Sequence, residues 1–484
     1  MGNMMRVTTL SIQSTSALRC QFARIHGTHT RLLHSSSQMQ QNSERRRAVP
    51  AGWLRRIMED DSKPPKLYAW TPENLSKGGW RKSRTVAGWS DRDDRIYILG
   101  VGNIGRLYAM CLSNIANSPP ITLVVHRKAL LEHWAAEPGV VLKRHGETHV
   151  NTRFDIEWWT ETPPSEGPVT EVAAGRNIGN LIIATKATDA MPQVDRIRRY
   201  LGGDSTVAFA QNGMCKLWPP LGDAYVRARF PDGTSPDWVA CVTTHGVTSQ
   251  GPFKSTHTAP AGVLVGPVMS GGVDRVGEAE TGNLMRLIAG APGLNARRVS
   301  RKELWVAQLE KLVVNAIINP LTAVLRCKNG EIFVARDDAL PAVIDELLGE
   351  ASETLRTLIY DSKSDEILLS PPASQGAVPE TSEVESLGAT REQLSERFSF
   401  SRLQIMVLDV GAKVGANTSS MLQDVRAGKQ TEIDDFNGWL VDTARLLDKG
   451  LQVPTHEKLI ALVKSEATLS RSELCARLLG DKRR

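Results

Sequence analysis

A polar stripe runs along residues 311–320, whose sequence is KLVVNAIINP. Lys311, Asn315 and Asn319 recur every four residues, and the positions between them are apolar. Because steps of four residues advance only about 40° around an α-helix, these side chains are predicted to share one helix face. A buried ammonium group and two buried amides need polar partners, and a bound substrate could supply them. A solvent-exposed stripe on an amphipathic helix is equally compatible with the spacing.

Two further polar clusters follow in the C-terminal half. Residues 417–424, NTSSMLQD, concentrate short hydrogen-bonding side chains at a predicted helix start, where one of the first two residues could instead be a helix cap. Residues 429–434, KQTEID, place Glu432 directly before an apolar run, and the Thr and final Asp of this segment have capping-box spacing. Spacing alone leaves the functional and the capping interpretations open.

A glycine-rich turn lies between a predicted strand and a predicted helix at residues 95–105, RIYILGVGNIG. Gly100 would permit the tight turn, Gly102 would let the backbone approach a pyrophosphate, and Gly105 would allow close packing of helix on strand. The start of the helix would then offer unpaired N–H groups to phosphates. The context therefore predicts a dinucleotide site, although GxGxxG alone is weak.

The next predicted strand ends in VVHRK, residues 124–128. A domain that prefers NAD would place an acidic residue there to bind the ribose 2′-hydroxyl. This chain has His126, Arg127 and Lys128 instead. These cations favour the 2′-phosphate of NADP(H), and an ordinary basic loop is the alternative.

Two later strand ends also carry polar side chains. In IIATKATD (182–189), Lys186 follows a strand, and in AFAQNGM (208–214), Asn212 does the same. Ligands bind at the carboxyl ends of strands in open α/β sheets, so Lys186 could reach a cofactor phosphate or ribose. Asn212 could contact the nicotinamide ribose or the substrate. Either residue alone is more often an ordinary loop residue.

Short apolar runs alternate with helical segments from residue 95 to about residue 300, which predicts βαβ units and a mainly parallel sheet. The predicted strands are 95–99, 122–126, 180–185, 206–211, 239–244 and 262–265. After residue 300 the periodicity is helical. The predicted helices are 302–326, 340–360, 396–413, 431–449 and 455–465.

Three segments fall outside this pattern. Residues 361–395 are rich in Pro, Ser, Gly and acids, which predicts a disordered insertion. Residues 51–92 are polar and rich in Trp, and are predicted to pack loosely on the next domain. Residues 1–50 hold seven Arg, one Glu and no Lys or Asp, so this arm accounts for the whole net charge of +6. The remainder is neutral, which argues against a nucleic-acid-binding surface.

The composition of residues 1–50 is typical of a mitochondrial transit peptide and predicts a matrix location. A basic tail without a targeting role, and therefore a cytoplasmic protein, is the alternative. No apolar run is long enough to predict a membrane span. The six Cys are scattered without a CxxC pair, which favours reduced thiols, and no metal site is predicted.

Taken in order, the motifs resemble ketopantoate reductase (2-dehydropantoate 2-reductase). The matching strings are GVGNIG, HRK, TKATD, QNGM, KLVVNAIINPLTAVLRCKNGE and NTSSMLQDVRAGKQTEIDDFNGWLV. The resemblance covers most of residues 95–470, and its two long strings are specific. It implies an α/β Rossmann-type dinucleotide-binding domain at 93–300, followed by an all-α C-terminal domain at 301–484. The active site would lie in the cleft between them.

The resemblance also implies a division of roles. NADPH would deliver hydride to the ketone of a small 2-oxo acid, reducing ketopantoate to pantoate in pantothenate and coenzyme A biosynthesis. Lys311 would be the general acid, with a pKa lowered by burial, and Glu432 would orient the substrate hydroxyl. The implied substrate-binding residues are Asn315, Asn319, Asn417 and Ser420. The implied cofactor-binding residues are Gly100, Gly102, Asn103, Ile104, Gly105, Arg127, Lys186 and Asn212.

Two departures and two alternatives accompany the resemblance. The family often has an aromatic residue two positions after the Lys of TKATD, and the segments 1–92 and 361–395 lie outside its compact pattern. The alternatives are a related NADP-dependent hydroxy-acid dehydrogenase and a non-catalytic mitochondrial binding or assembly protein on the same fold. The strings NTSSMLQD and TEID favour the reductase. Homodimerisation is left open.

Overall fold

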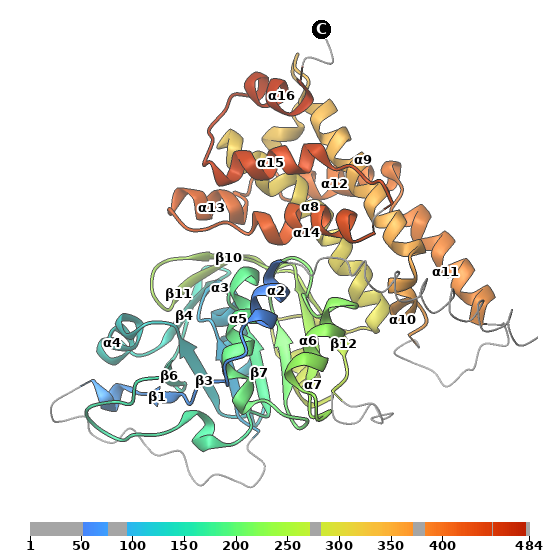
Figure 1. Cartoon of the computed structure of the whole chain (residues 1–484). Helices are drawn as coiled ribbons and strands as arrows, with labels where there is room; N and C mark the ends of the chain where they lie inside the picture. Colours follow the sequence, from blue (N-terminus) through green and yellow to red (C-terminus); the bar gives the residue numbers. More distant parts are fainter. Residues whose placement is uncertain (1–51, 76–93, 272–281, 371–382, 448, 481–484) are drawn as a thin grey trace, which may run out of the picture. The chain divides into compact units, whose positions relative to one another are not determined.

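A nine-stranded, mainly parallel sheet dominates the first half of the described chain (Figure 1). Its strand order is β1-β6-β3-β2-β7-β8-β9-β12-β13. The strands from β6 to β9 pair in parallel, whereas β1 and β12 run antiparallel to β6 and β9. The bounds are β1 (Tyr68–Trp70), β2 (Ile96–Leu99), β3 (Ile121–Val125), β6 (Asp155–Thr160), β7 (Asn180–Ile183), β8 (Thr206–Phe209), β9 (Asp237–Thr243), β12 (Val263–Met269) and β13 (Ala296–Arg298).

The central strands are buried on both faces. All residues of β2, β3, β7, β8 and β9 are buried, as expected for a covered parallel sheet. Ile96 and Ile98 of β2 belong to one core cluster, while Tyr97 and Leu99 belong to another, so a separate core lies on each face. The helices of this half are α3 (Asn103–Leu112), α4 (Lys128–Ala136), α5 (Ala187–Ile197), α6 (Leu221–Arg229) and α7 (Gly282–Gly290), with 3₁₀ turns η2 (Val172–Gly175) and η3 (Arg198–Tyr200).

The structure describes residues 52–75, 94–271, 282–370, 383–447 and 449–480. The predicted transit peptide lies outside these residues. All six predicted strands are present, with their ends shifted by a few residues. The prediction of a Rossmann-type α/β domain followed by a helical domain is therefore confirmed.

A smaller four-stranded sheet, in the order β10-β11-β4-β5, was not predicted. Most residues of β5 are exposed, and its sequence ETHVN lacks an apolar alternation that would reveal a strand. Helix α3 contacts β4, β10 and β11. The bounds are β4 (Val140–Arg144), β5 (Glu147–Asn151), β10 (Gly246–Ser249) and β11 (Lys254–Ala259).

A 25-residue helix, α8 (Arg301–Leu325), opens the helical half. Ser300 caps it, because its hydroxyl accepts from the Glu303 N–H (3.2 Å) while the Glu303 carboxylate accepts from the Ser300 N–H (2.9 Å). Arg326 ends it in the left-handed region at φ 54°. The other elements are η4 (Asn329–Phe333), α9 (Leu340–Tyr360), α12 (Phe400–Lys413), α13 (Ser420–Arg426), α14 (Ile433–Leu447), α15 (Pro454–Lys464) and α16 (Arg471–Leu479). None of the described helices is long and apolar enough to cross a membrane.

The predicted disorder of residues 361–395 is wrong for the parts that are described. They form η5 (Ser362–Ser364), α10 (Asp365–Leu368) and most of α11 (Glu383–Arg397), while 371–382 lie outside the described residues. Ile367, Leu368 and Leu394 are buried in the main core. Sparse apolar residues thus dock these short helices on the bundle, although the surrounding composition is polar.

The prediction of loose packing for residues 51–92 is also wrong over the described residues 52–75. Helix α2 (Gly52–Glu59) buries Leu54 and Ile57, and Leu67 is fully buried. Strand β1 then extends the sheet, and η1 (Pro72–Asn74) follows it. This extension is therefore an integral part of the α/β half.

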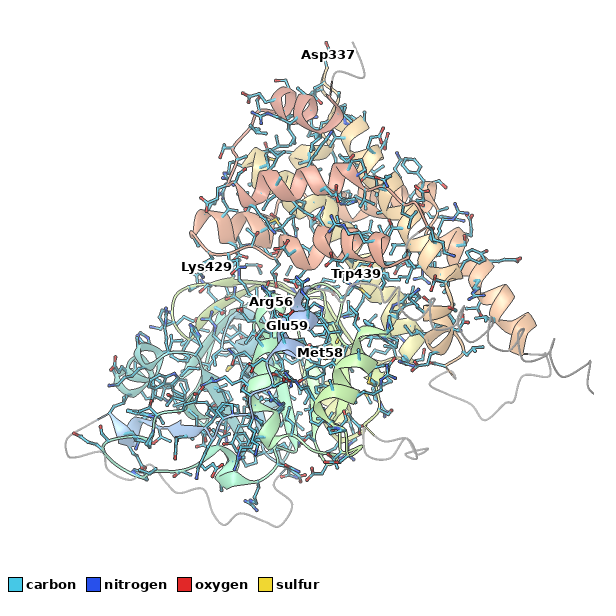
Figure 2. All side chains as sticks on the ribbon, in the orientation of Figure 1. Arg56, Met58, Glu59, Asp337, Lys429 and Trp439 are labelled. Carbon is cyan, nitrogen blue, oxygen red and sulfur yellow. The ribbon has the colours of Figure 1, made fainter. Side chains whose placement is uncertain are left out.

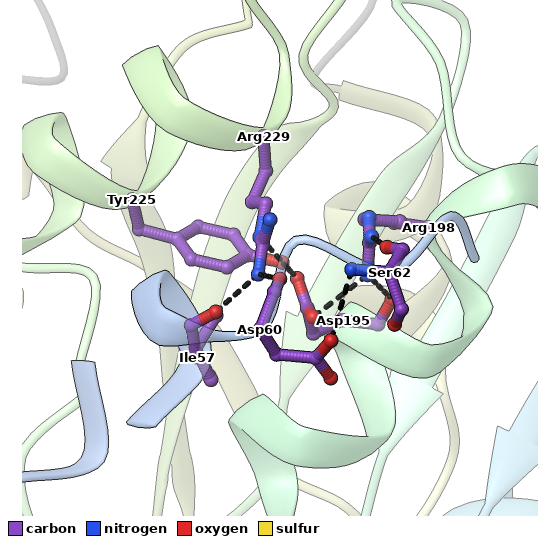
Figure 3. Close-up of polar contacts among 7 residues, drawn as sticks. All are labelled: Ile57, Asp60, Ser62, Asp195, Arg198, Tyr225 and Arg229. Atoms are coloured by element: carbon purple, nitrogen blue, oxygen red, sulfur yellow. Dashed lines mark hydrogen bonds and ion pairs between the residues drawn. The ribbon is translucent and has the colours of Figure 1, made fainter. Parts of the chain in front are cut away.

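A buried carboxylate on α5 fastens the extension (Figure 3). Asp195 is only 7% exposed and forms ion pairs with Arg198 (2.7 Å) and Arg229 (3.1 Å). Arg229 donates to the carbonyls of Ile57 and Asp60, and Arg198 donates to the Ser62 carbonyl. One carboxylate thereby orients two guanidinium groups that hold the backbone of the extension.

Asp195→Asn should weaken this attachment of the extension, because two half-buried guanidinium groups lose their counter-charge. We expect the free energy of unfolding in urea to fall by about 3 kcal/mol, the scale of breaking a buried ion pair. Proteolysis near residues 57–62 should accelerate. Asp232→Asn, in an exposed turn, is the matched control and should leave both readouts unchanged. Equal stability of the two variants would contradict a stabilising role for the ion pairs of Asp195.

Candidate active site

Helix α8 brings a lysine to the carboxyl ends of two central strands. Lys311 Nζ donates to Asn212 Oδ1 (2.9 Å) and to the Thr243 carbonyl oxygen. Asn212 lies just beyond β8, and Thr243 is the last residue of β9. The lysine of the helical half and the asparagine of the QNGM motif, predicted separately from the sequence, are thus in direct contact.

The ammonium group of Lys311 is held in an environment that disfavours its charge. Burial lowers the pKa of Lys311 to about 8, and the negative charge of Glu432 partly opposes this shift. The hydrogen bonds of Lys311 are to an amide and a carbonyl, which orient the charge without neutralising it. An amine with a pKa near 8 can hold a proton at neutral pH and also release it readily.

Glu432 lies at the start of α14 and meets the start of α5. Its Oε1 accepts from the Ala187 N–H (3.2 Å), an N–H group at a helix N-terminus. The residue is only 8% exposed, and burial raises the pKa of its carboxyl group. Because α14 begins at Ile433, Glu432 stands directly before the helix.

Asn319 of α8 and Ser420 of α13 lie next to each other. Asn319 is 7% exposed, so the stripe is not a solvent-exposed face, and its Nδ2 lies 3.5 Å from Ser420 Oγ. Asn315 lies between Lys311 and Asn319 and is partly buried. The capping interpretation of the NTSS segment holds for neither of its first two residues, because Ser419 is the helix cap, accepting from the Leu422 N–H (3.1 Å).

Asn417 is the predicted substrate residue with the least structural support. Its side chain is exposed, and its backbone carbonyl accepts from the Asn329 N–H (3.0 Å). The backbone of Asn417 therefore ties the segment before α13 to η4. The described structure brings Asn319 and Ser420 together but does not link the Asn417 side chain to them.

The glycine-rich turn has the form that a dinucleotide requires. Gly100 has φ +101°, and a Cβ there would lie 2.7 Å from the backbone of Ala184. A Cβ on Gly105 would lie 2.0 Å from the Gly100 carbonyl oxygen, so the helix packs directly on the turn. At Gly102 nothing lies within 4 Å of the added Cβ, which leaves its outer side open. These are the positions at which a nucleotide pyrophosphate can approach the backbone.

Asn103 and Ile104, also predicted at the cofactor, have other contacts. The amide of Asn103 donates to the Val247 carbonyl (3.2 Å), which ties the turn to β10. Ile104 packs against the core beside the sheet. Only the backbone N–H groups of these residues therefore remain candidates for contact with a phosphate.

The two basic residues predicted at the cofactor differ in their surroundings. Arg127 follows β3 and is exposed at the start of α4. Lys186, just before α5, forms an ion pair with Asp424 (2.8 Å) and donates to the Gln430 carbonyl. Gln430 lies in the segment that connects α13 to α14. Lys429, in this same segment, is labelled in Figure 2 on the side of the helical half that faces the sheet. Lys186 therefore also connects the two halves.

A second lysine bridge was missed from the sequence. Lys216 forms an ion pair with Asp435 (3.0 Å) and donates to the Ala187 carbonyl (3.0 Å). Thr188 donates to the other carboxylate oxygen of Asp435 (2.6 Å). Lys216 follows the QNGM motif and Asp435 follows Glu432, so both adjoin predicted site residues. No spacing rule connects them, because their separation is set by tertiary structure.

Two family models match the chain on either side of this site. The model described as ketopantoate reductase PanE/ApbA matches residues 96–270, and its C-terminal counterpart matches residues 303–467. The chain belongs to the ketopantoate reductase family. The recognition made from the motifs is confirmed, and the protein is an oxidoreductase whose cofactor is a nicotinamide dinucleotide.

Two curated proteins and one solved structure illustrate what the chain is similar to. Ketoisovalerate reductase BEA2 of Gibberella fujikuroi is 45% identical over 447 residues, covering 88% of this chain and 98% of that protein. A probable 2-dehydropantoate 2-reductase of Schizosaccharomyces pombe is 28% identical, covering 80% of this chain and all of that protein. The fold resembles that of D-mandelate dehydrogenase with NADH and anilino(oxo)acetate (TM-score 0.53, 17% identity, 77% of this chain and 97% of that one).

Alanine substitutions in the turn should separate folding from nucleotide binding. In Gly102→Ala the added methyl meets no protein atom, so we expect unchanged thermal stability but at least about tenfold weaker NADPH binding by fluorescence titration. In Gly105→Ala the methyl overlaps the Gly100 carbonyl, so stability should fall as well.

Gly349→Ala, which has open space in α9, is the control and should bind NADPH normally. Normal binding by Gly102→Ala would contradict this placement of the cofactor.

Proposed function

We propose that this protein uses NADPH to reduce a small branched 2-oxo acid to the 2-hydroxy acid, with 2-ketoisovalerate as the preferred substrate. The observation that carries the chemistry is Lys311, whose pKa is lowered by burial and whose Nζ contacts Asn212 and Thr243 at the carboxyl ends of β8 and β9. The substrate follows from the higher identity to the ketoisovalerate reductase, 45%, than to the S. pombe protein named for 2-dehydropantoate, 28%.

The proposed reaction consumes one NADPH and one proton for each 2-oxo acid. When bound, the nicotinamide would supply the hydride to the carbonyl carbon. Lys311 would donate a hydrogen bond to the carbonyl oxygen and then transfer the proton from Nζ as negative charge develops there. Solvent would restore the proton to the amine. Asn212 and the Thr243 carbonyl would hold the lysine in place before the substrate arrives.

The other polar groups would position the substrate. Asn315 and Asn319 follow Lys311 on the same face of α8, and Ser420 lies beside Asn319. Amide and hydroxyl donors on this face suit a carboxylate, which accepts several hydrogen bonds. Glu432, close enough to influence the pKa of Lys311, would balance the charge of the ammonium group.

Ketopantoate, the substrate expected from the sequence, is the second candidate. It differs from 2-ketoisovalerate by a hydroxymethyl group, which needs a hydrogen-bonding partner when buried. The Asn319–Ser420 pair could provide one. Pockets that bind a hydroxyl discriminate strongly against analogues that lack it, so a direct comparison of the two acids is decisive.

The preference for NADPH rests on the basic end of β3. His126, Arg127 and Lys128 are all exposed there, where a 2′-phosphate would lie. Within the described residues, no acidic side chain occupies the positions directly after β3 to bind a ribose 2′-hydroxyl instead.

We also propose that residues 1–50 direct the protein to the mitochondrial matrix, which fusion of this segment to a fluorescent protein would test.

A substrate panel with the full chain tests the proposed function. We expect NADPH oxidation with 2-ketoisovalerate at a higher kcat/KM than with ketopantoate, and none with 3-oxo acids. Lys311→Met should lower kcat by about 100- to 10,000-fold, because the proton donor is removed. Its thermal stability should not fall, because a buried charge is removed.

Lys302→Met, a partly exposed lysine on the same helix, is the control and should remain active. Turnover with 3-oxo acids alone would support the hydroxy-acid dehydrogenase alternative. NADPH binding without any turnover would support the non-catalytic one.

The pH dependence of reduction should report the lysine. Because the protonated amine is the acid, kcat/KM should fall as pH rises through about 8. Glu432 raises the pKa of Lys311, so Glu432→Gln should move this alkaline limb to lower pH, whatever its effect on the rate. Glu457→Gln, at an exposed position of α15, should leave the limb in place. An unmoved limb in Glu432→Gln would refute the coupling.

A further inference from the structure

A buried arginine directly follows the last glycine of the GxGxxG turn. Arg106 lies in α3 and is only 5% exposed. Its Nε donates to the Gly102 carbonyl (3.1 Å), one residue before Asn103 and on the glycine whose outer side is open. No role for this arginine followed from the sequence motif, which ends at Gly105.

The other N–H groups of Arg106 are satisfied by the β10–β11 hairpin and by Asn103. One terminal nitrogen donates to the carbonyls of Gly251 and Lys254, both at 2.7 Å. The other donates to Asn103 Oδ1 (2.9 Å) and lies 3.4 Å from Ser249 Oγ. The guanidinium group therefore joins the glycine turn to the hairpin, with one end of its fork on each.

All these partners are neutral. No carboxylate among the described residues lies within ion-pair distance of Arg106, whereas the half-buried Arg198 and Arg229 share Asp195. Burial lowers the pKa of Arg106 to about 10, so it remains charged at neutral pH. A buried cation normally has a counter-charge, because its desolvation is costly. Here the described residues supply dipoles to hold the cation but no anion to neutralise it.

We propose that Arg106 is a positioning residue for the cofactor's pyrophosphate, whose negative charge completes the charge balance across the Gly102 turn. The arginine does not touch the cofactor in this arrangement. Its hydrogen bonds hold the Gly102 peptide and the hairpin, and it acts on the cofactor through the positive charge that it places behind the N–H groups that face the phosphates. Arg127 would bind the adenosine 2′-phosphate instead, at a different point on the same cofactor.

Two fragments of the cofactor distinguish this role from a purely structural one. ADP-ribose carries the pyrophosphate without the 2′-phosphate, and 2′-AMP carries the 2′-phosphate without the pyrophosphate. Calorimetry on full-length Arg106→Gln should show about tenfold or greater loss of affinity for ADP-ribose, or about 1.4 kcal/mol, with 2′-AMP changed less than about twofold. Arg127→Gln should show the reverse pattern.

Arg106→Lys tests whether charge is the property that matters, and it serves if Arg106→Gln does not fold. Lysine keeps the positive charge but cannot form the planar fork. We expect it to bind ADP-ribose within about threefold of the wild type. Ser249→Ala, which removes one acceptor and no charge, should bind both fragments normally.

Two results would overturn the proposal. One is an equal loss of both fragments in Arg106→Gln, which would indicate a general disturbance of the fold. The other is a loss of ADP-ribose binding in Arg106→Lys as large as that in the neutral variant. Because neither readout uses turnover, failure of the proposed substrate would leave this test intact.

Discussion

The structure depends above all on the placement of the Lys311 ammonium group between a helix, α8, and the ends of two strands of the sheet. Lys311 is carried by a long helix, but its partners are a side chain and a carbonyl at the ends of two strands. The lysine can keep a lowered pKa only while α8 packs on the sheet, because separation would rehydrate it. The α/β half, the capped helix and the strand ends are therefore all needed to set one proton affinity.

Several further polar contacts between the halves converge at the start of α5. Ala187 donates its N–H to Glu432 and offers its carbonyl to Lys216, while Lys186 just before it pairs with Asp424. Helix N-termini favour negative charge, so the carboxylates of α13 and α14 suit this position. Closely paired charges and a helix dipole thus give the contact a defined geometry, although each bridge alone contributes little when partly exposed.

The features predicted well from the sequence were those with a local signature. The six predicted strands, the glycine turn and α8 each carry their pattern within about 25 residues, as hydrophobic periodicity or a required conformation. The Lys–Asn stripe gave the correct face of α8 for the same reason. Residues 361–370 and 383–395 were misjudged, because a few apolar residues such as Ile367 and Leu394 dock short polar helices.

The features that were missed depend on contacts between distant residues. Lys216 and Asp435 are separated by more than two hundred positions, and Arg106 meets carbonyls of a hairpin that is itself too polar to recognise. Ion pairs and carbonyl contacts leave no periodic trace in the sequence. Their partners become visible only when the fold places them side by side.

The extension that precedes the α/β half has one further consequence, for the edge of the sheet. Strand β1 pairs with β6 at Trp158, Trp159 and Thr160, and so occupies hydrogen-bonding groups that would otherwise face outward. An uncovered edge rich in tryptophan is a template for pairing with another chain. The three-residue strand β1 therefore covers the edge of β6, so that this edge cannot pair with another chain.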